Sequence, residues 1–139
     1  VEEYHSNHPQ FKKSSKKALG LFFLVGGGIA LTLWAFSPWI ITIIFGDKFS
    51  PSIAVLEVLS GAIFLFFLNF LLANILISSG RESINTWNLV GATVANITLN
   101  LVLIPQYGAI GAAWSTLFCE AVLIFALGIE VRKCISSNS

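Results

Sequence analysis

Three long stretches without a charged side chain constrain this chain more than any other feature of its sequence. They comprise 29 residues between Lys17 and Asp47, 23 between Glu57 and Arg81, and 37 between Glu82 and Glu120. A helix that crosses a lipid bilayer needs about 20 apolar residues. The first two stretches therefore predict one membrane span each, and the third is long enough for two spans if it is broken.

A proline and a glycine divide the third stretch. We expect Pro105 to end one helix and Gly108 to allow the reversal, because proline interrupts helices and glycine adopts turn conformations. The predicted fold is all-α, a polytopic membrane protein with four transmembrane helices over residues 18–36, 53–79, 84–104 and 109–131. Residues 1–17 form a polar and basic segment before these helices, and residues 134–139 form a short tail.

The ends of the predicted helices carry recognisable signals. Pro38 disfavours a regular helix after residue 36, so residues 40–45 are predicted as a short interfacial helix or a kinked continuation. Ser50 and Pro51 suit the N-cap and the first position of the second helix. A tight turn at Ser79 and Gly80 predicts that the second and third helices are antiparallel neighbours.

Composition excludes several classes of protein. Charged residues make up 11% of the chain and the mean hydropathy is +0.82, whereas a soluble domain carries about a quarter charged residues. A net charge of +1 gives no basic face for nucleic acid. The two cysteines lie in different settings and predict neither a disulfide nor a metal site. The sequence offers no catalytic constellation, so we expect no enzyme activity and no cofactor.

The basic residues predict the orientation in the membrane. Seven of the eight lie on one side of the predicted topology, namely Lys12, Lys13, Lys16, Lys17, Arg81, Arg132 and Lys133. Positive residues mark the cytoplasmic side. Both termini and the Arg81 turn are thus predicted to be cytoplasmic, in the cytoplasmic (inner) membrane, with Lys48 on the far side. The chain lacks an initiator Met, which predicts the C-terminal part of a longer protein.

Four asparagines share one face of the third predicted helix. At about 100° per residue, an arc of about 120° contains Asn85, Asn88, Asn96 and Asn100. Unpaired amides facing lipid cost several kcal/mol, so these side chains either line a polar cavity or bond to neighbouring helices. The small residues Gly91, Ala95 and Thr98 form an adjoining stripe that is suited to close helix packing.

Glu120 is the charged residue that lies deep within a predicted span. A carboxylate at this depth is costly, and such residues face a cavity, pair with a cation or carry a proton. The structural alternative is a bond to one of the asparagines. Asn69 and Asn74 lie about 140° apart on the second helix, and we expect them to form interhelical hydrogen bonds.

The segment Asn100-Leu-Val-Leu-Ile-Pro-Gln-Tyr-Gly-Ala-Ile-Gly-Ala-Ala-Trp-Ser-Thr116, followed by Glu120, resembles a known family. It is similar to the C-terminal domain of the lipid-linked oligosaccharide flippases that serve polysaccharide biosynthesis, in the multidrug, oligosaccharidyl-lipid and polysaccharide exporter superfamily. The segment 45–49 and the Ser79-Gly80 turn agree with this. Within the motif, Pro105, Tyr107, Gly108 and Gly111 have structural roles: helix end, interfacial anchor, reversal and close packing.

The resemblance implies a larger, two-lobed transporter that works by alternating access, of which these helices are the last four. Its expected partners are membrane lipids, the remaining helices and an oligosaccharide linked to undecaprenyl diphosphate, with Glu120 and the asparagine face lining the central cavity. Two alternatives remain open. One is a multidrug or cation-coupled exporter in which Glu120 is a proton or sodium site; the other is a membrane scaffold without transport activity.

Overall fold

The computed structural model is all-α and describes residues 8–136 of the 139, with side chains at Lys17, from residue 20 to 134, and at Ser136. The helices are α2 (His8–Phe45), the short 3-10 helix η1 (Asp47–Phe49), α3 (Ser52–Ser78), α4 (Glu82–Tyr107) and α5 (Ala109–Ser136). Parts of the predicted end segments, residues 1–7 and 137–139, lie outside the described residues.

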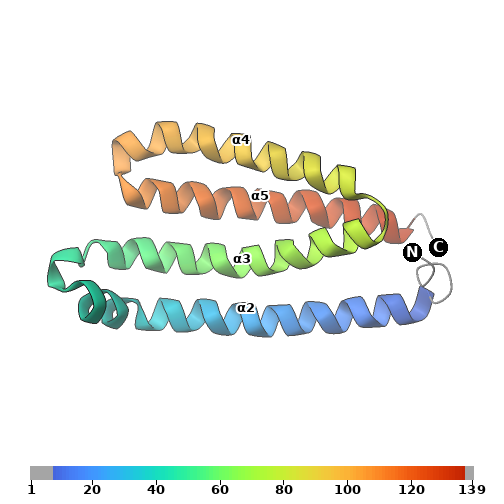
Figure 1. Ribbon diagram of the computed structural model, residues 1–139, viewed down its shortest axis with the longest axis horizontal. Coiled ribbons are helices and arrows are strands. Elements are labelled where there is room, and N and C mark those ends of the chain that lie inside the picture. The colour runs from blue at the N-terminus through green and yellow to red at the C-terminus, as the bar shows by residue number, and fades with distance from the viewer. Residues whose placement is uncertain (1–7, 137–139) are drawn as a thin grey trace.

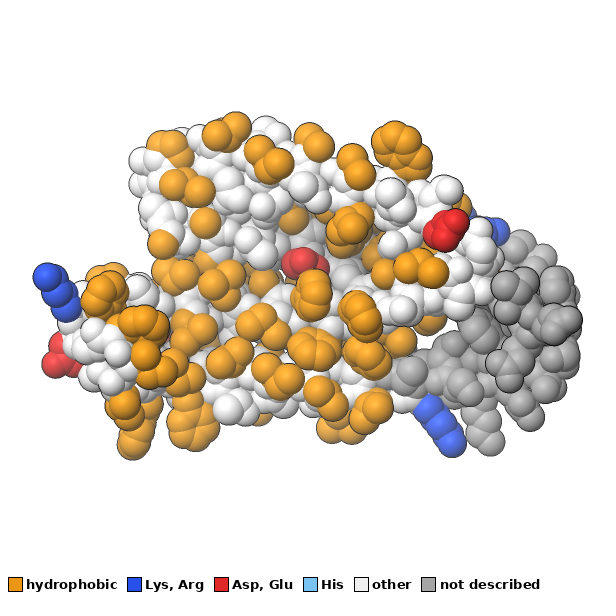
Figure 2. Space-filling view, in the orientation of Figure 1, with side chains coloured by type: hydrophobic (Ala, Val, Ile, Leu, Met, Phe, Trp, Pro, Cys, Tyr) orange, Lys and Arg blue, Asp and Glu red, His pale blue; other side chains and the backbone are white. Residues whose placement is uncertain are grey.

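Four of these helices are long and apolar enough to cross a membrane. The spans assigned by length and composition are Gly20–Phe45, Ser52–Ser78, Glu82–Tyr107 and Ala109–Cys134. The prediction of an all-α chain with four membrane helices is therefore confirmed. Figure 2 shows one face of the bundle, where hydrophobic side chains extend along its length and Lys and Arg side chains lie at its ends.

The helices lie side by side in the order α2, α3, α5, α4 (Figure 1). The chain runs up and down, so α3 and α5 are parallel to each other, and both are antiparallel to α2 and α4. The predicted neighbours α3 and α4 are antiparallel and joined by a tight turn. However, α3 packs far more extensively against α5 than against α4.

Continuation of the first helix past Pro38 is one of the two predicted alternatives, whereas the helix end expected at Pro105 lies further along the chain. Helix α2 continues through Pro38 to Phe45, and Pro105 lies inside α4, which ends at Tyr107. A proline removes one backbone hydrogen bond, and membrane helices tolerate this where neighbouring groups compensate. Ser50 is not the N-cap of α3: Pro51 holds that position without a side-chain cap, while the Ser50 hydroxyl donates to the carbonyl of Asp47.

Glycines make the two turns between the last three helices. Gly80 has φ +71° and Gly108 has φ +63°, a region that favours glycine. The N–H of Gly108 donates to the carbonyl of Ile104 at 2.8 Å and so closes the end of α4. The predicted reversal at Gly108 is therefore confirmed, three residues beyond the proline that was expected to end the helix.

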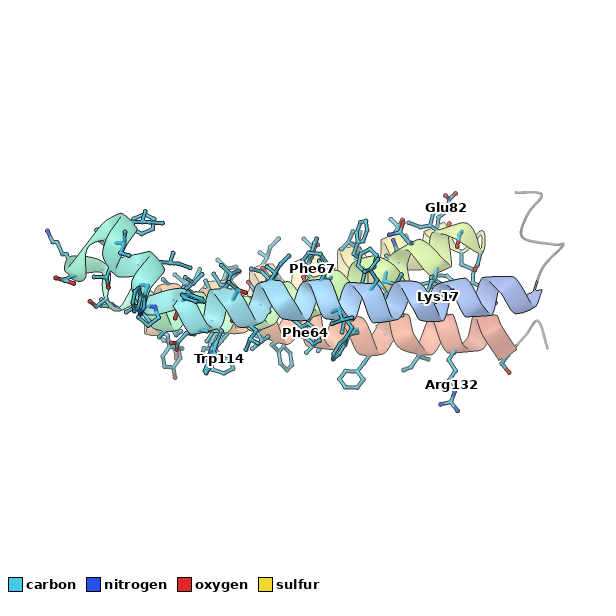
Figure 3. The ribbon with its side chains drawn as sticks, turned by 90° about the horizontal axis from the view of Figure 1, so that it is seen from below. Lys17, Phe64, Phe67, Glu82, Trp114 and Arg132 are labelled. Atoms are coloured by element: carbon cyan, nitrogen blue, oxygen red, sulfur yellow. The ribbon has the colours of Figure 1, made fainter. Side chains whose placement is uncertain are left out.

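Close packing joins α2 to α3. A Cβ added at Gly26 would lie 2.8 Å from Cβ of Phe67, so only glycine fits there without a shift. The rings of Phe23 and Phe64 meet edge to face, with centroids 5.1 Å apart. Figure 3 shows Phe64 and Phe67 near the middle of the bundle, with Lys17, Glu82 and Arg132 toward one end.

Helix α5 is one of the two inner helices of the row because, like α3, it packs extensively against two neighbours. Buried residues follow one another along its length: Ala113, Ser115, Cys119, Leu123, Leu127 and Val131. Leu123, Leu127 and Val131 form a core cluster with Leu76 of α3. In contrast, the described residues of α4 include none that is fully buried, so α4 has most of its surface free for lipid or for other helices.

Candidate functional site

The interface between α3 and α5 holds Glu120 against Asn69. The Asn69 amide Nδ2 donates to the backbone carbonyl of Glu120 at 2.9 Å and to its Oε2 at 2.7 Å. Asn69 is 4% exposed, and Glu120 is half-buried. The asparagine partner of Glu120 thus comes from α3 and not from the asparagine face of α4.

The sequence offered a bond between Glu120 and one of the asparagines as the structural alternative without saying which one, and the structure identifies Asn69. The angle of about 140° between Asn69 and Asn74 around the helix axis predicts that they do not share a face. In the structure the two also have different hydrogen-bond partners. Asn74 is exposed and donates to the carbonyl of Phe70 in its own helix. The expected interhelical hydrogen bond is therefore confirmed for Asn69, whereas the bond that Asn74 forms within the described part of the chain is intrahelical.

A second polar contact joins α4 to α5. The Ser115 hydroxyl is fully buried and donates to Oδ1 of Asn100, whose Nδ2 donates to Oδ1 of Asn96 at 2.9 Å. The two asparagines stand one helical turn apart, so their amides meet along α4. Two of the four asparagines of the predicted face, Asn96 and Asn100, are therefore linked by hydrogen bonds to each other and to Ser115 of α5.

The other two asparagines of this face lie nearer the start of α4. Asn88 donates to the carbonyl of Ile84 in its own helix at 2.9 Å, and both Asn85 and Asn88 are half-buried. Gly91, Ala95 and Thr98 are exposed rather than packed against a helix of the described chain. A groove of about 240 Å³ runs between α4 and α5 here, with Gly91 and Cys119 among its walls.

A third polar pair lies between α2 and α3 and was not predicted. Ser37 is fully buried, and its hydroxyl donates to Oε1 of Glu57 at 3.2 Å. In the sequence Glu57 looked like a residue of the first helical turns that reaches headgroup water. The sequence does contain a signal for this pair. Ser37, next to Pro38, and Glu57 lie at comparable distances from the facing ends of the first and second spans.

The glycine motif brings α4 and α5 together at their joining turn. A Cβ added at Gly111 would lie 2.5 Å from the carbonyl oxygen of Leu103 and 2.9 Å from its carbon. Gly111 is therefore a point of backbone contact between the two helices. Tyr107 is 60% exposed at the end of α4, where an aromatic anchor for the membrane interface is expected.

In the described residues, no group of three or more His, Cys, Asp and Glu side chains could hold a metal ion. The polar side chains can instead do three things: hydrogen-bond between helices, hold or release a proton at a carboxyl, and present amides to a polar ligand.

The chain is similar to an uncharacterized membrane protein of Methanocaldococcus jannaschii. The two are 38% identical over 91 residues, which cover 65% of this chain and 18% of the archaeal protein. The chain thus matches less than a fifth of that relative's length. No protein-family model matches, and no solved structure matches. Together with the four apolar helices, this distant similarity identifies a multi-pass membrane protein.

Proposed function

We propose that this chain is part of a transporter that moves lipid-linked oligosaccharides across the cytoplasmic membrane for polysaccharide biosynthesis. One observation carries the proposal. Helix α4 bears a row of half-buried asparagines, yet none of its 26 residues is fully buried. Because amides in a bilayer require polar partners, a row that the described chain covers only in part suits the wall of a polar path completed by further helices.

Two further points support the proposal. The segment from Asn100 to Thr116 resembles oligosaccharide flippases, and Gly108 and Gly111 make the corner that this motif requires. The similarity to a membrane protein of which this chain spans 18% agrees with a role as one part of a longer transporter. The substrate would be an oligosaccharide linked to undecaprenyl diphosphate, and the remaining helices would complete its path.

The diphosphate of such a substrate needs cationic partners. The four predicted spans contain neither Lys nor Arg. The proposal therefore assigns the diphosphate to basic residues outside these spans and the uncharged sugars to the asparagine face.

The test replaces two of the four half-buried asparagines of α4 in the full-length protein. Asn85→Ala with Asn96→Ala should lower glycan export roughly tenfold, the effect of about 1.4 kcal/mol on a rate. Asn74→Ala is the matched control, because Asn74 is exposed and bonds only to its own helix. Membrane levels of each variant are measured alongside. Equal export by the double variant and the control, at equal levels, would contradict the proposal.

A second candidate is a multidrug or cation-coupled exporter, which the position of Glu120 favours. In that case export would follow a drug rather than a glycan and would depend on an ion gradient. Glu120→Ala should then abolish export without reducing membrane insertion. If deletion of the whole gene leaves both glycan export and drug export unchanged, the third alternative, a membrane scaffold, is favoured.

A further inference from the structure

The hydrogen bonds of Asn69 leave one of its atoms unmatched. Both N–H groups of Nδ2 are used, one on the backbone carbonyl and one on Oε2 of Glu120. Its Oδ1 is buried and has no hydrogen-bond partner among the described residues. Since an amide oxygen is an acceptor, the missing group is a donor or a cation.

The carboxyl of Glu120 also lacks a compensating charge. Besides Glu120, the charged or titratable side chains on the described parts of α3, α4 and α5 are Glu57, Glu82, Tyr107, Cys119, Glu130, Arg132, Lys133 and Cys134. Of these, Cys119 is adjacent in sequence and so points about 100° away around α5. The others lie toward the helix ends, at least ten residues along the chain from Glu120 or from Asn69. The cations are Arg132 and Lys133, which lie about 18 Å or more along the helix axis.

We propose that Glu120 binds a proton inside the membrane and that Asn69 holds this acid form. Protonation forms one O–H bond on the carboxyl and removes its charge, with no other bond changed. The new O–H is the donor that Oδ1 of Asn69 lacks, while Oε2 continues to accept from Nδ2. One proton therefore removes both the uncompensated charge and the unmatched acceptor.

The surroundings favour a proton over a metal ion. Hard cations such as Ca²⁺ take six to eight oxygen ligands, and the described residues contain no cluster of three or more acidic, His or Cys side chains. Asn69 and Glu120 offer only the amide oxygen and the carboxyl. A carboxylic acid needs a single acceptor for its proton, and Oδ1 is that acceptor.

This inference deepens the proposed function by naming what Glu120 binds. It requires that the helices cross a membrane, but it does not depend on which substrate is transported. Its test therefore does not measure export. Infrared difference spectra are recorded on the full-length protein in lipid bilayers at neutral pH. The spectrum of the unchanged protein minus that of Glu120→Gln should contain the C=O band of a protonated carboxyl. The control Glu82→Gln, at the exposed start of α4, should remove carboxylate bands only.

The role of Asn69 is tested by the position of the acid band. Asn69→Leu removes the acceptor and should move the band to higher frequency, while Asn74→Leu should leave it in place. This comparison also carries the test if Glu120→Gln does not accumulate in the membrane. An unmoved band in Asn69→Leu would overturn the role of Asn69.

Two other results would overturn the proposal. One is a difference spectrum with carboxylate bands alone, because Glu120 would then be ionised. The other is replacement of the acid band by carboxylate bands when sodium chloride is substituted for choline chloride at equal ionic strength. In that case the occupant of the site is a sodium ion.

Discussion

Single polar side chains decide the contacts inside this bundle, because a bilayer offers no water to replace a missing partner. Ser115, Asn69 and Ser37 are each buried, and each bonds to a residue of another helix. Their types were visible in the sequence. Their partners were not, since an asparagine at mid-span can equally face a cavity, its own backbone or a neighbouring helix, as Asn74 and Asn69 illustrate.

The bond between Ser115 and Asn100 should contribute a measurable coupling energy. We expect Ser115→Ala to lower the free energy of unfolding by about 0.6–1 kcal/mol, the typical worth of a hydrogen bond between membrane helices. A double-mutant cycle with Asn100→Ala, measured by unfolding in detergent, isolates this term. Thr98→Ala is the control, because that hydroxyl is exposed and bonds only to the carbonyl of Val94. Additive effects of Ser115→Ala and Asn100→Ala would show that the bond contributes nothing.

At the scale of the helices, glycine spacing sets which pairs approach closely. Gly111 brings α5 against the backbone of Leu103 in α4, and Gly26 brings α2 against Phe67 in α3. The motif around Pro105 and Gly108 predicted the first contact from local sequence. Of the three successive glycines at 26–28, the sequence could not say which one meets a neighbour: Gly28 has no heavy atom near its added Cβ.

Substitutions of two glycines in α5 should therefore differ in sign. Gly111→Ala places a Cβ 2.5 Å from the carbonyl oxygen of Leu103 and should cost about 1–3 kcal/mol of stability, as overpacking does. Gly128→Ala meets no heavy atom of the described residues within 4 Å and should be neutral or stabilise by up to about 1 kcal/mol, from higher helix propensity. Thermal unfolding followed by circular dichroism compares them. Equal midpoints for the two variants would show that α4 and α5 do not meet at Gly111.

For the whole molecule, the up-and-down path places alternate turns on opposite sides of the membrane. Glu82 and Arg132 lie toward the same end of the bundle as Lys17, and Trp114 lies toward the other (Figure 3). The bias of basic residues predicts that the first end is cytoplasmic.

Labelling of single cysteines tests this orientation. In a background with the native cysteines replaced, Lys48→Cys should react with a membrane-impermeant maleimide in intact cells. Ser83→Cys should react only after the cells are opened. Both positions are exposed, so access depends on the side of the membrane. Labelling of both in intact cells would contradict the path of the chain, and the reverse pattern would contradict the orientation.

By itself, the sequence determined the four apolar helices, the turns at Gly80 and Gly108 and the depth of Glu120, because span length, turn chemistry and charge position are local properties. It left open whether α2 continues past Pro38 and did not predict that α4 continues through Pro105, since this depends on compensation by neighbouring groups. Only the tertiary structure decided that α5 lies between α3 and α4 and that Glu120 meets Asn69. The physical reason is that four apolar helices have several possible neighbours, and the choice among them depends on how side chains distant in sequence fit together.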